Sequence, residues 1–450
     1  MRSRAVLLLT VMMTATLLMV ASPAWATTFT VNSTADLDQS PNEPGCFTGR
    51  LVPGGDISLV RECTLRAAIQ QANALRGTSD NIDFASWLNG TITLTQGLLT
   101  IANDTSGPDL NIEGLGGSGL TVSGINTDRV FLINSGADVT INRLTISGGS
   151  KGFGGGILNN GTLTLTNATV SANTAEQVGG GIFNGGTLTV RNSTVSANEA
   201  AGLGGGIYNG GTLMLTNATV SANTAVEDGG IHTEGGVGTA KLSNTIVARN
   251  AATTDDPDVS GLFTSLGNNL IGNTSGSGST NWSDSDLLNQ DPLIGPLQNN
   301  GGPTNTHALL QGSPAIDRAT NFGCPSTDQR GFTRTDGDAD GTATCDIGAF
   351  EAANTKPTIT DLRPAPGSKT RDRTPPIAAT VSDAQTNLAM TNIKLFVDGS
   401  RKATFSYAPS TDRLSYTSGR LSFGRHTVKI IATEGLNRTT RSWRLTVVRR

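Results

Sequence analysis

The middle of the chain repeats one pattern of apolar and polar residues. Three blocks that open with Gly-Gly-Gly-Ile start at residues 154, 179 and 204, so their period is 25 residues. In the first block the run Thr-Leu-Thr-Leu-Thr alternates polar and apolar residues, and Thr-Val-Ser follows shortly after it. Alternation at period two predicts short strands and argues against helical repeats. An internal repeat of this length predicts a solenoid of stacked coils.

Stacked coils place equivalent residues of successive blocks above one another, at the ~4.8 Å spacing of neighbouring strands. The repeated Ile, Leu and Val residues are therefore expected to form interior columns, while the Thr and Ser residues face water. Asn167, Asn192 and Asn217 fall where one strand bends into the next, which predicts a left-handed backbone and a side-chain bond to the neighbouring coil. The Gly triplets are expected at a second corner, where a positive φ excludes side chains.

One helix is predicted before the repeats. Thr64 is a good N-cap residue, and the apolar spacing after it predicts a helix from Leu65 to about Leu75. The expected buried stripe is Leu65, Ala68, Ile69 and Ala72, with Gly77 after the end. Ala67 stands where a reciprocal capping box needs Glu, so half of the box is missing. The helix would cover the first coil, whose open strand edges otherwise invite aggregation.

Both ends of the chain differ from the repeats. Residues 1–26 have two Arg residues, an apolar run and Ala-Trp-Ala, which predicts a cleaved signal peptide. No later segment is apolar for the ~20 residues that a membrane-spanning helix needs. After a Pro-rich stretch, residues 377–381, 393–397, 403–407, 426–432 and 443–448 alternate as strands do, and Asp398-Gly399 predicts a hairpin turn. These signals predict an immunoglobulin-like sandwich without a Cys pair.

Charge divides the chain in the same place. Residues 355–450 hold 17 Lys and Arg against 6 Asp and Glu, a net charge of +11, while the remainder holds 15 against 30, a net charge of -15. Such asymmetry suggests that the basic part meets an anionic partner, with a solubilising charge balance as the alternative. An exported protein has little occasion to meet nucleic acid, so we expect a cell-envelope polymer or an extracellular glycan instead.

Four cysteines in an exported chain predict disulfides. Three pairings are possible for four cysteines, and we favour Cys46 with Cys63 and Cys324 with Cys345, because each pair closes a local loop. Each bond would stabilise its loop by ~3 kcal/mol on the loop-entropy model. The spacing fits neither a redox motif nor a zinc site.

An acidic run near the second cysteine pair has the spacing of a calcium loop. Its alternating carboxylates are Asp336, Asp338 and Asp340. A Gly follows them, as the sharp turn of such loops requires. The twelfth position is Ile347 rather than Glu, so a bidentate ligand would have to come from Asp346 or Glu351. The alternative is a solvated acidic turn.

A fourth block, from residue 227, departs from the repeat and is the best place for an enzyme site. It brings in Glu227, Asp228, His232, Glu234, Lys241 and Arg249. Catalysis by polysaccharide lyases and hydrolases needs several carboxylates, or carboxylates with basic residues, on one face. The three regular blocks offer almost none, and the solenoid region holds only two tryptophans for sugar stacking, Trp87 and Trp282. We therefore expect a scaffold rather than an enzyme.

The repeat motif, Gly-Gly-Gly-Ile-x-Asn followed by Thr-Val-Ser-x-Asn, resembles right-handed parallel β-helices of the pectate-lyase-like class. It is most similar to the repeats of polymorphic outer-membrane proteins and related bacterial adhesins. Residues 28–84, with Glu-Cys-Thr-Leu-Arg-Ala-Ala, resemble the N-terminal module named for its Cys-Ser-Leu-Arg-Glu-Ala motif. Residues 291–351 resemble the choice-of-anchor Q domain. The resemblance implies an all-β fold and no chemistry that could be assigned to particular residues.

The sequence therefore predicts an all-β chain with five parts. These are a signal peptide (1–26), an N-terminal cap module (27–84), a right-handed parallel β-helix (85–290), a choice-of-anchor Q-like C-terminal cap module (291–354) and a basic immunoglobulin-like domain (355–450). We expect a secreted or cell-surface, monomeric, structural and adhesin-like protein without catalytic residues. The alternative is a polysaccharide-active lyase or hydrolase.

Overall fold

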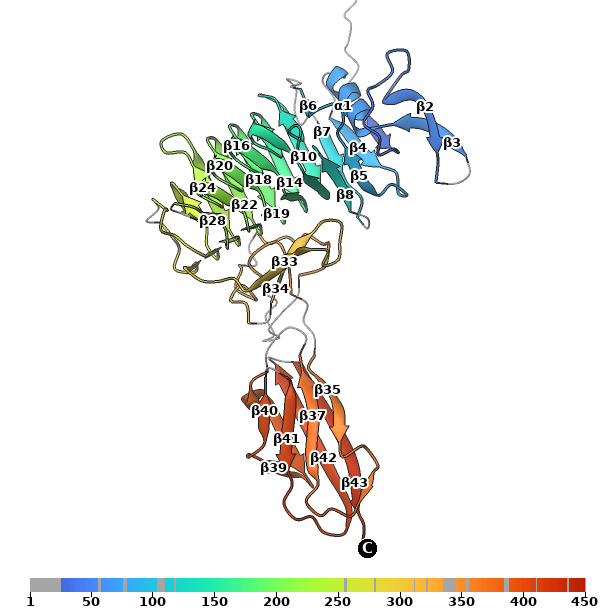
Figure 1. Cartoon of the computed structure of the whole chain (residues 1–450), viewed down its shortest axis with the longest axis vertical. Helices are drawn as coiled ribbons and strands as arrows, with labels where there is room; N and C mark the ends of the chain where they lie inside the picture. Colours follow the sequence, from blue (N-terminus) through green and yellow to red (C-terminus); the bar gives the residue numbers. More distant parts are fainter. Residues whose placement is uncertain are drawn as a thin grey trace, which may run out of the picture.

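The computed structural model describes residues 26–449, apart from residues 56–57, 76–78, 103–109, 117–118, 255–256, 279–280, 311, 321–322, 335–344, 353–355, 384–387, 410 and 435–436. Nearly all of the predicted signal peptide and the whole of the acidic run from Asp336 to Asp340 lie outside the described residues. Both therefore stay predictions. The described chain is all-β except for one α-helix and one 3₁₀ turn, and it forms a parallel solenoid and a C-terminal sandwich (Figure 1).

The solenoid has four parallel sheets, in which strands of successive coils pair side by side. The first sheet contains β1 (Thr28–Val31), β4 (Asp80–Phe84), β7 (Leu110–Glu113), β10 (Asp138–Asn142), β14 (Thr162–Thr166), β18 (Thr187–Arg191), β22 (Thr212–Thr216), β26 (Thr239–Ser243) and β30 (Phe263–Ser265). The second sheet contains β5 (Gly90–Thr93), β8 (Leu120–Ser123), β11 (Leu144–Ser147), β15 (Thr169–Ser171), β19 (Thr194–Ser196), β23 (Thr219–Ser221), β27 (Ile246–Ala248), β31 (Leu270–Ile271) and β32 (Leu287–Leu288).

Two further sheets complete the coils. The third sheet contains β6 (Leu99–Ile101), β9 (Phe131–Ile133), β13 (Ile157–Asn159), β17 (Ile182–Asn184), β21 (Ile207–Asn209), β25 (Ile231–Thr233) and β29 (Val259–Ser260). The fourth sheet contains β12 (Ser150–Phe153), β16 (Thr174–Val178), β20 (Glu199–Leu203), β24 (Thr224–Glu227) and β28 (Ala251–Ala252). The fourth sheet spans fewer coils than the other three, and its strands follow those of the second sheet along the chain, as β16 follows β15.

The predicted interior columns are confirmed. Leu163, Leu188 and Leu213 pair in register on the first sheet, and their side chains are buried. The repeated Ile residues of β13, β17 and β21 pair in the same way on the third sheet. Because equivalent apolar residues stack from coil to coil, they form one continuous core along the solenoid. Burial of this apolar surface stabilises the fold by about 25 cal/mol per Å².

Asparagine also forms two ladders inside the solenoid, which the sequence analysis did not anticipate. In the longer ladder, the side-chain amide of each residue donates to the next coil over 2.8–2.9 Å. Its members are Asn173, Asn198, Asn223 and Asn250. The shorter ladder consists of Asn159, Asn184 and Asn209. All of these side chains are buried, so the ladders satisfy polar groups that would otherwise be costly to bury.

The corner predicted at Asn167, Asn192 and Asn217 is confirmed in its backbone, because their φ angles are 50°, 45° and 48°. The predicted side-chain bonding is only partly correct. Asn167 donates to the preceding coil over 3.0 Å. Asn217 accepts from Asn244 of the next coil over 3.4 Å, and it also donates to the carbonyl oxygen of Asp346. Asn192 instead donates to the carbonyl oxygen of Thr327, far along the chain.

The Gly triplets also differ from expectation. Only the first glycine of each triplet, as at Gly179 with φ 70°, lies in the left-handed region. The second and third are needed for close approach: a Cβ at Gly180 would lie 2.4 Å from the carbonyl oxygen of Glu199. The positive-φ argument is therefore wrong for two of the three positions, which are restricted by packing between coils instead.

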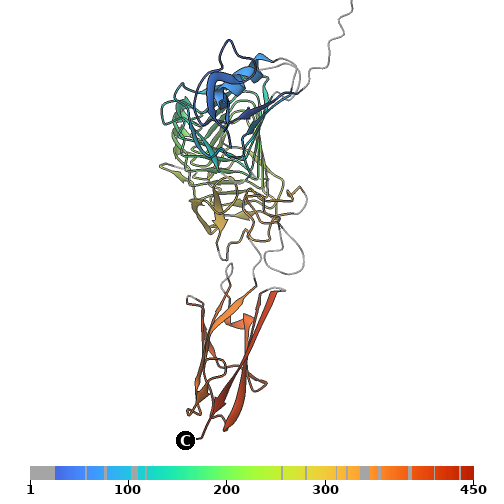
Figure 2. The same cartoon turned by 90° about the vertical axis from the view of Figure 1, so that its right-hand side faces the viewer.

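The predicted helix is confirmed as α1 (Leu65–Ala74). Thr64 caps it, because its Oγ1 accepts a 3.1 Å hydrogen bond from the backbone nitrogen of Ala67. The helix packs against the first strands and covers that end of the solenoid (Figure 2). A hairpin of β2 (Phe47–Pro53) and β3 (Leu59–Cys63) lies next to it, and the disulfide between Cys46 and Cys63 is formed as predicted.

The described residues of the range 291–352, called the lateral segment below, lie along the side of the solenoid against the second sheet (Figure 1). The segment contains the antiparallel strands β33 (Ile294–Gln298) and β34 (Thr306–Leu309), and the predicted disulfide between Cys324 and Cys345. Gln329 is fully buried and donates to Thr169 over 2.9 Å, while its Oε1 accepts from Thr194 over 2.7 Å. We expected a cap over the last coil, but the described part covers the flank of several coils.

This arrangement corrects the expectation that outward Thr and Ser residues face water. On the second sheet, Thr169, Thr194 and Thr219 point outward and are buried under the lateral segment. One coil later the equivalent residue is Ile246, which packs with Leu270 against the apolar side chains of the segment. The change from hydroxyl to apolar residues along this row is the sequence signal of that contact.

The C-terminal domain has two sheets around its own core. One contains β35 (Thr358–Arg363), β37 (Pro376–Ser382), β41 (Arg413–Thr417) and β40 (Ser406–Ala408). The other contains β36 (Lys369–Thr370), β43 (Asn437–Val447), β42 (Gly424–Glu434), β38 (Ile393–Val397) and β39 (Ser400–Lys402), and the 3₁₀ turn is η1 (Met390–Asn392). Asp398 and Gly399 have positive φ and join β38 to β39, which confirms the predicted hairpin. The strand predicted over residues 403–407 is confirmed only at its end, because β40 begins at Ser406 and β39 ends at Lys402.

Candidate functional site

The best-defined candidate site is a row of rings on the third sheet. Phe183, Tyr208 and His232 occupy the outward position of β17, β21 and β25, next to the buried Ile of each strand. We call these three residues the aromatic row. The rings of Phe183 and Tyr208 stack with centroids 5.1 Å apart, and those of Tyr208 and His232 with centroids 5.0 Å apart. The parallel register of the strands holds the rings at one coil spacing.

The row has a defined beginning and end. In the block before it, the equivalent residue is Leu158, and Phe153 of β12 meets the ring of Phe183 edge-on at 5.7 Å. In the coil after it, the equivalent residue is Ser260, which carries no ring. The row is therefore confined to three successive coils.

Asp228 holds the last ring in place. It occupies the position that Gly154, Gly179 and Gly204 occupy in the regular blocks, and it keeps their left-handed backbone with φ 58°. The Nδ1 atom of His232 donates to Oδ2 of Asp228 over 2.6 Å, and the Asp228 side chain is only 4% exposed. The fourth block thus exchanges a glycine for a buried carboxylate directed at the imidazole.

Glu234 joins the two outer rings from the other side. The hydroxyl of Tyr208 donates to Oε2 of Glu234, and Nε2 of His232 lies 3.6 Å from the same oxygen. Glu234 is 44% exposed, so it is the most accessible polar group of the cluster. Asp228, His232, Glu234 and Tyr208 therefore form one polar cluster at the surface, in which two hydrogen-bonded pairs meet at the contact between His232 and Glu234.

The electrostatics of the cluster raise the pKa values of both His232 and Tyr208. Burial lowers the pKa of His232, but the hydrogen bond to Asp228 and the negative charges of Asp228 and Glu234 outweigh it, so the pKa lies above its ordinary value. Burial, followed by the hydrogen bond to Glu234, raises the pKa of Tyr208 to about 12. The cluster thus offers an imidazole, a hydroxyl and a carboxylate at fixed positions.

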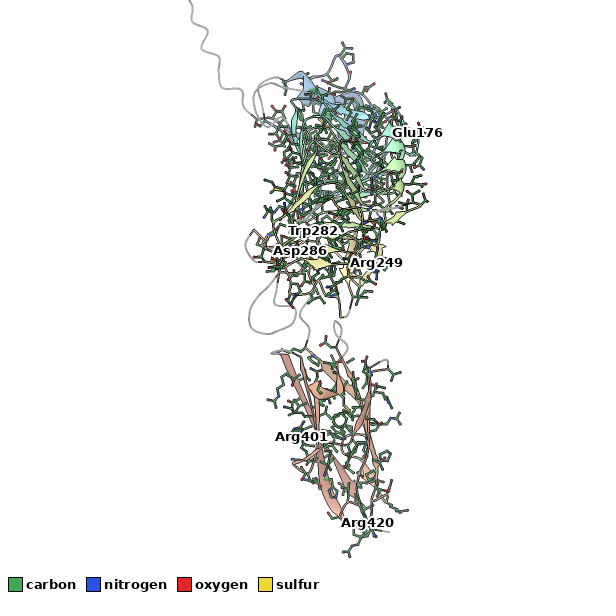
Figure 3. All side chains as sticks on the ribbon, turned by 90° about the vertical axis from the view of Figure 1, so that its left-hand side faces the viewer. Glu176, Arg249, Trp282, Asp286, Arg401 and Arg420 are labelled. Carbon is green, nitrogen blue, oxygen red and sulfur yellow. A yellow bond between two sulfur atoms is a disulfide. The ribbon has the colours of Figure 1, made fainter. Side chains whose placement is uncertain are left out.

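The structure separates the other charged residues of the fourth block from this cluster. Glu227 is exposed on β24, and Lys241 lies on the first sheet. Arg249 binds the carboxylate of Asp291 over 2.8 Å and the carbonyl oxygen of Ile294, so it fastens the lateral segment (Figure 3). Of the six residues singled out in the sequence, Asp228, His232 and Glu234 come together.

The aromatic row was not predicted from the sequence, because only tryptophans were considered as sugar-stacking residues. Trp282 packs against Phe263 at the solenoid core with ring centroids 6.2 Å apart, and Trp87 is 46% exposed elsewhere. The signal for the row was the residue after the repeated Ile, which changes from Phe to Tyr to His in successive blocks. When the blocks are aligned with one another, this position predicts that the three rings stack.

The predicted metal ligands are not placed by the structure. Asp336, Asp338 and Asp340 lie outside the described residues, and within the described part no three His, Cys, Asp or Glu side chains gather as a metal site. The two proposed additional ligands have other roles. Both carboxylate oxygens of Asp346 accept backbone hydrogen bonds, and Oε2 of Glu351 pairs with Arg334 over 2.8 Å. Calcium binding would therefore rest on the acidic run itself.

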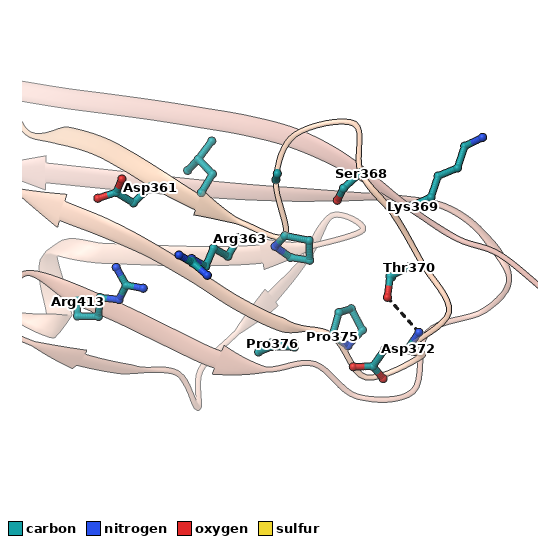
Figure 4. Close-up of a pocket in the computed structure, with 12 residues that line it drawn as sticks. Asp361, Arg363, Ser368, Lys369, Thr370, Asp372, Pro375, Pro376 and Arg413 are labelled. Atoms are coloured by element: carbon teal, nitrogen blue, oxygen red, sulfur yellow. Dashed lines mark hydrogen bonds between the residues drawn. The ribbon is translucent and has the colours of Figure 1, made fainter.

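A hollow of about 850 Å³ opens on the C-terminal domain (Figure 4). Its lining carries both signs of charge, with Asp361 and Asp372 beside Arg363, Lys369 and Arg413. Such a mixture selects no single ligand chemistry, so the aromatic row remains the better-defined site.

Comparisons with protein-family models, curated proteins and solved structures found no match for this chain. The resemblances to polymorphic outer-membrane repeats, to the N-terminal cap module and to the choice-of-anchor Q domain therefore stay predictions. In the described part of the chain, no helix is long and apolar enough to cross a membrane.

Proposed function

We propose that the protein is an exported, adhesin-like structural protein, whose solenoid displays a binding surface for an extracellular glycan without catalysing a reaction. The observation that carries this proposal is the group formed by Tyr208, His232 and Glu234 at the end of the aromatic row. The group lies on paired strands of successive coils, whose register fixes the place of each side chain. Binding groups on regular elements are held more accurately than groups on loops.

The chemistry of the group suits a saccharide. Because the rings stack on one another, their edges rather than their faces are available at the surface, and ring edges are electropositive. Tyr208, His232 and Glu234 add donors and an acceptor beside these edges. Saccharide hydroxyls both donate and accept hydrogen bonds, so they match such an arrangement.

Asp228 gives a second reason to place function here. The regular blocks carry Gly at this left-handed corner, whereas the fourth block carries a carboxylate that is hydrogen-bonded to His232. Two disulfides support the exported address, since such bonds persist in oxidising compartments.

The test is a glycan-binding screen of the purified protein and two variants. His232→Leu should weaken binding about tenfold or more, because a hydrogen bond to a charged group contributes ~1.5–3 kcal/mol. Leu is already present at the equivalent position as Leu158, so the fold should tolerate it. Lys241→Gln on the first sheet is the matched control and should bind as the wild type does. Unchanged affinity in His232→Leu would contradict the proposal.

A polysaccharide lyase or hydrolase is the second candidate, favoured by the accessible Glu234 next to an imidazole that a buried carboxylate orients. This candidate requires cleavage of a polysaccharide by the wild type. It also requires loss of that cleavage in the triple variant D228A/H232A/E234A with its fold retained, as judged by circular dichroism. Cleavage of this kind would replace the non-catalytic assignment.

A further inference from the structure

We infer that the outward face of the five-stranded sheet in the C-terminal domain binds a linear acidic polysaccharide. The inference deepens the proposed function, and rests on it only for the source of the polymer, an anionic component of the cell envelope or of the surrounding matrix. The face itself is defined by the structure of the C-terminal domain and does not involve the aromatic row.

The register of the strands gathers basic side chains on this face. Val428, Trp443 and Leu395 point into the core, so the residues that alternate with them point outward. Seven of these outward residues are basic: Lys369, Lys394, Arg401, Arg425, Lys429, Arg438 and Arg444. Figure 3 shows Arg401 on the flank of the domain. Seven of the domain's 17 basic residues thus share one face.

Acidic side chains do not neutralise this face. Among the described residues of the domain, the carboxylate of Asp398 pairs with His426, and none of the seven cations takes part in an ion pair. The outward face of the other sheet differs, since its Arg363 and Arg413 stand near Asp361 at the rim of the hollow (Figure 4). Lys369 also lines that hollow, but the other six cations do not, so the five-stranded sheet is the face with the larger uncompensated charge.

The spacing of the cations fits an extended chain. Lys369, Thr446 and Arg425 lie in one row across three neighbouring strands. Two strand spacings separate the two cations of that row by about 10 Å. Along β42, Arg425 and Lys429 are four residues apart, which corresponds to about 13 Å of strand. A linear polymer with regularly repeated charges can contact such positions in succession, while a compact anion would reach only one or two.

The groups between the cations favour a polysaccharide over a lipid surface. Thr427, Thr440, Ser442 and Thr446 stand outward among the cations, where their hydroxyls can bond to sugar hydroxyls. Phe396 lies under Lys429 with the ammonium 4.6 Å from its ring centroid, so it does not protrude as an anchor for a bilayer would. Arg side chains also bind carboxylates in a bidentate manner, which suits uronate residues.

The test measures binding of the purified full chain to alginate, a linear carboxylated polysaccharide, with neutral dextran and phosphatidylserine-containing vesicles as comparison ligands. We expect alginate to bind and dextran not to bind. Affinity should fall steeply with salt, because screening shortens the range of exposed charges from ~8 Å at physiological ionic strength to ~3 Å at 1 M. The double variant R425Q/R444Q should bind alginate roughly threefold to thirtyfold more weakly, since each exposed charge contributes up to ~1 kcal/mol.

The matched control is R363Q/R413Q, which removes the same charge from the opposite sheet and should leave most of the affinity. Equal losses in the two double variants would show a non-specific charge effect and overturn the inference, and so would tighter binding to the vesicles than to alginate. His232→Leu separates the two proposals: it should not alter alginate binding. If it abolishes alginate binding, the polymer occupies the solenoid and the C-terminal face is not its site.

Discussion

At the scale of single residues, Asp228 shows how one change within a repeat creates a polar site. The backbone of the corner is the same in all four blocks, with a left-handed φ at each. A glycine leaves that corner without a side chain. Asp228 puts a carboxylate there, 2.6 Å from His232, at the cost of the strain that glycine avoids.

Removing this carboxylate should change the proton affinity of its partner. Asp228→Gly restores the residue found in the other blocks, so the backbone should be retained or slightly stabilised. The pKa of His232 should fall, because the hydrogen bond and charge that raise it are lost. Titration followed by nuclear magnetic resonance of the imidazole measures the shift. Glu227→Gln, at the neighbouring residue, should leave the pKa nearly unchanged, and an equal shift there would refute the assignment to Asp228.

The same pKa makes a prediction about stability and pH. Because the pKa of His232 is raised in the folded state, its stabilising contribution is fully present below the unfolded-state pKa of about 6.5. That contribution is lost as the pH rises through the folded-state value. The free energy of unfolding of the wild type minus that of His232→Leu should therefore be larger at about pH 5.5 than at about pH 9. Denaturant titrations at the two pH values measure it, and a difference independent of pH would argue against the predicted pKa.

A buried ion pair in the N-terminal cap offers a sharper stability test. The guanidinium of Arg66 bonds both carboxylate oxygens of Asp36 over 2.6 and 3.1 Å, and both side chains are buried. Arg66→Ala should lower the free energy of unfolding by about 3–5 kcal/mol, because it leaves Asp36 charged and unpaired. Arg61→Ala breaks the exposed pair with Glu43 and should cost less than about 1 kcal/mol. Similar losses in both variants would contradict this reasoning.

At the scale of elements, the local rules of the sequence predicted α1, the repeating strands and the hairpin turn at Asp398. Each depends on residues near one another in the chain: a cap three residues before its donor, an alternation of period two, a turn of two residues. The burial of Thr169 and Thr194 could not be predicted in this way, because their partner Gln329 lies more than 130 residues away. Neither could the side-chain bonds of Asn192 and Asn217, which also lead to the lateral segment.

The candidate site was predicted only in part, for a related reason. The irregular fourth block identified Asp228, His232 and Glu234 as a group, because they lie within seven residues of one another. Tyr208 and Phe183 were not connected to them. Their proximity results from stacking of successive coils, and only alignment of the blocks on their repeated Ile residues would have placed the three rings together.

The interior Asn ladders should prove as important as the apolar columns. Asn198 donates to Asn223 and to the carbonyl oxygen of Val170, and it accepts from Asn173, all within the core. Asn198→Ala should lower the free energy of unfolding by about 3 kcal/mol, because several buried polar groups each lose a partner at ~1–3 kcal/mol. Chemical denaturation measures the loss. Asn160→Ala, at an exposed position, should stay within about 0.5 kcal/mol of the wild type, and a comparable cost there would rule out the ladder as the cause.

At the scale of the whole molecule, the proposed binding of calcium to the acidic run would stabilise the lateral segment. If Asp336, Asp338 and Asp340 bind calcium, millimolar calcium should raise the melting temperature, because a ligand that binds only the folded state stabilises it. Scanning calorimetry with calcium and with a chelator measures the shift. The variant D336N/D338N/D340N should abolish it, and magnesium should produce less of it. Identical melting with and without calcium would leave a plain acidic turn.

The lateral segment also has a consequence for how the chain folds during synthesis. In a simple solenoid each coil contacts only its neighbours, so coils can form as soon as they are made. Here the lateral segment forms hydrogen bonds with residues between Asn167 and Asn268. Because the segment follows these residues in the sequence, it is synthesised after all of them. From residue 268 to residue 352 there are 84 residues, which take roughly 4–17 s at 5–20 residues per second. During that time Thr169, Thr194, Thr219 and Ile246 of the second sheet are not yet covered by the segment. A neighbouring chain or a chaperone that binds this face then would prevent the segment from packing there.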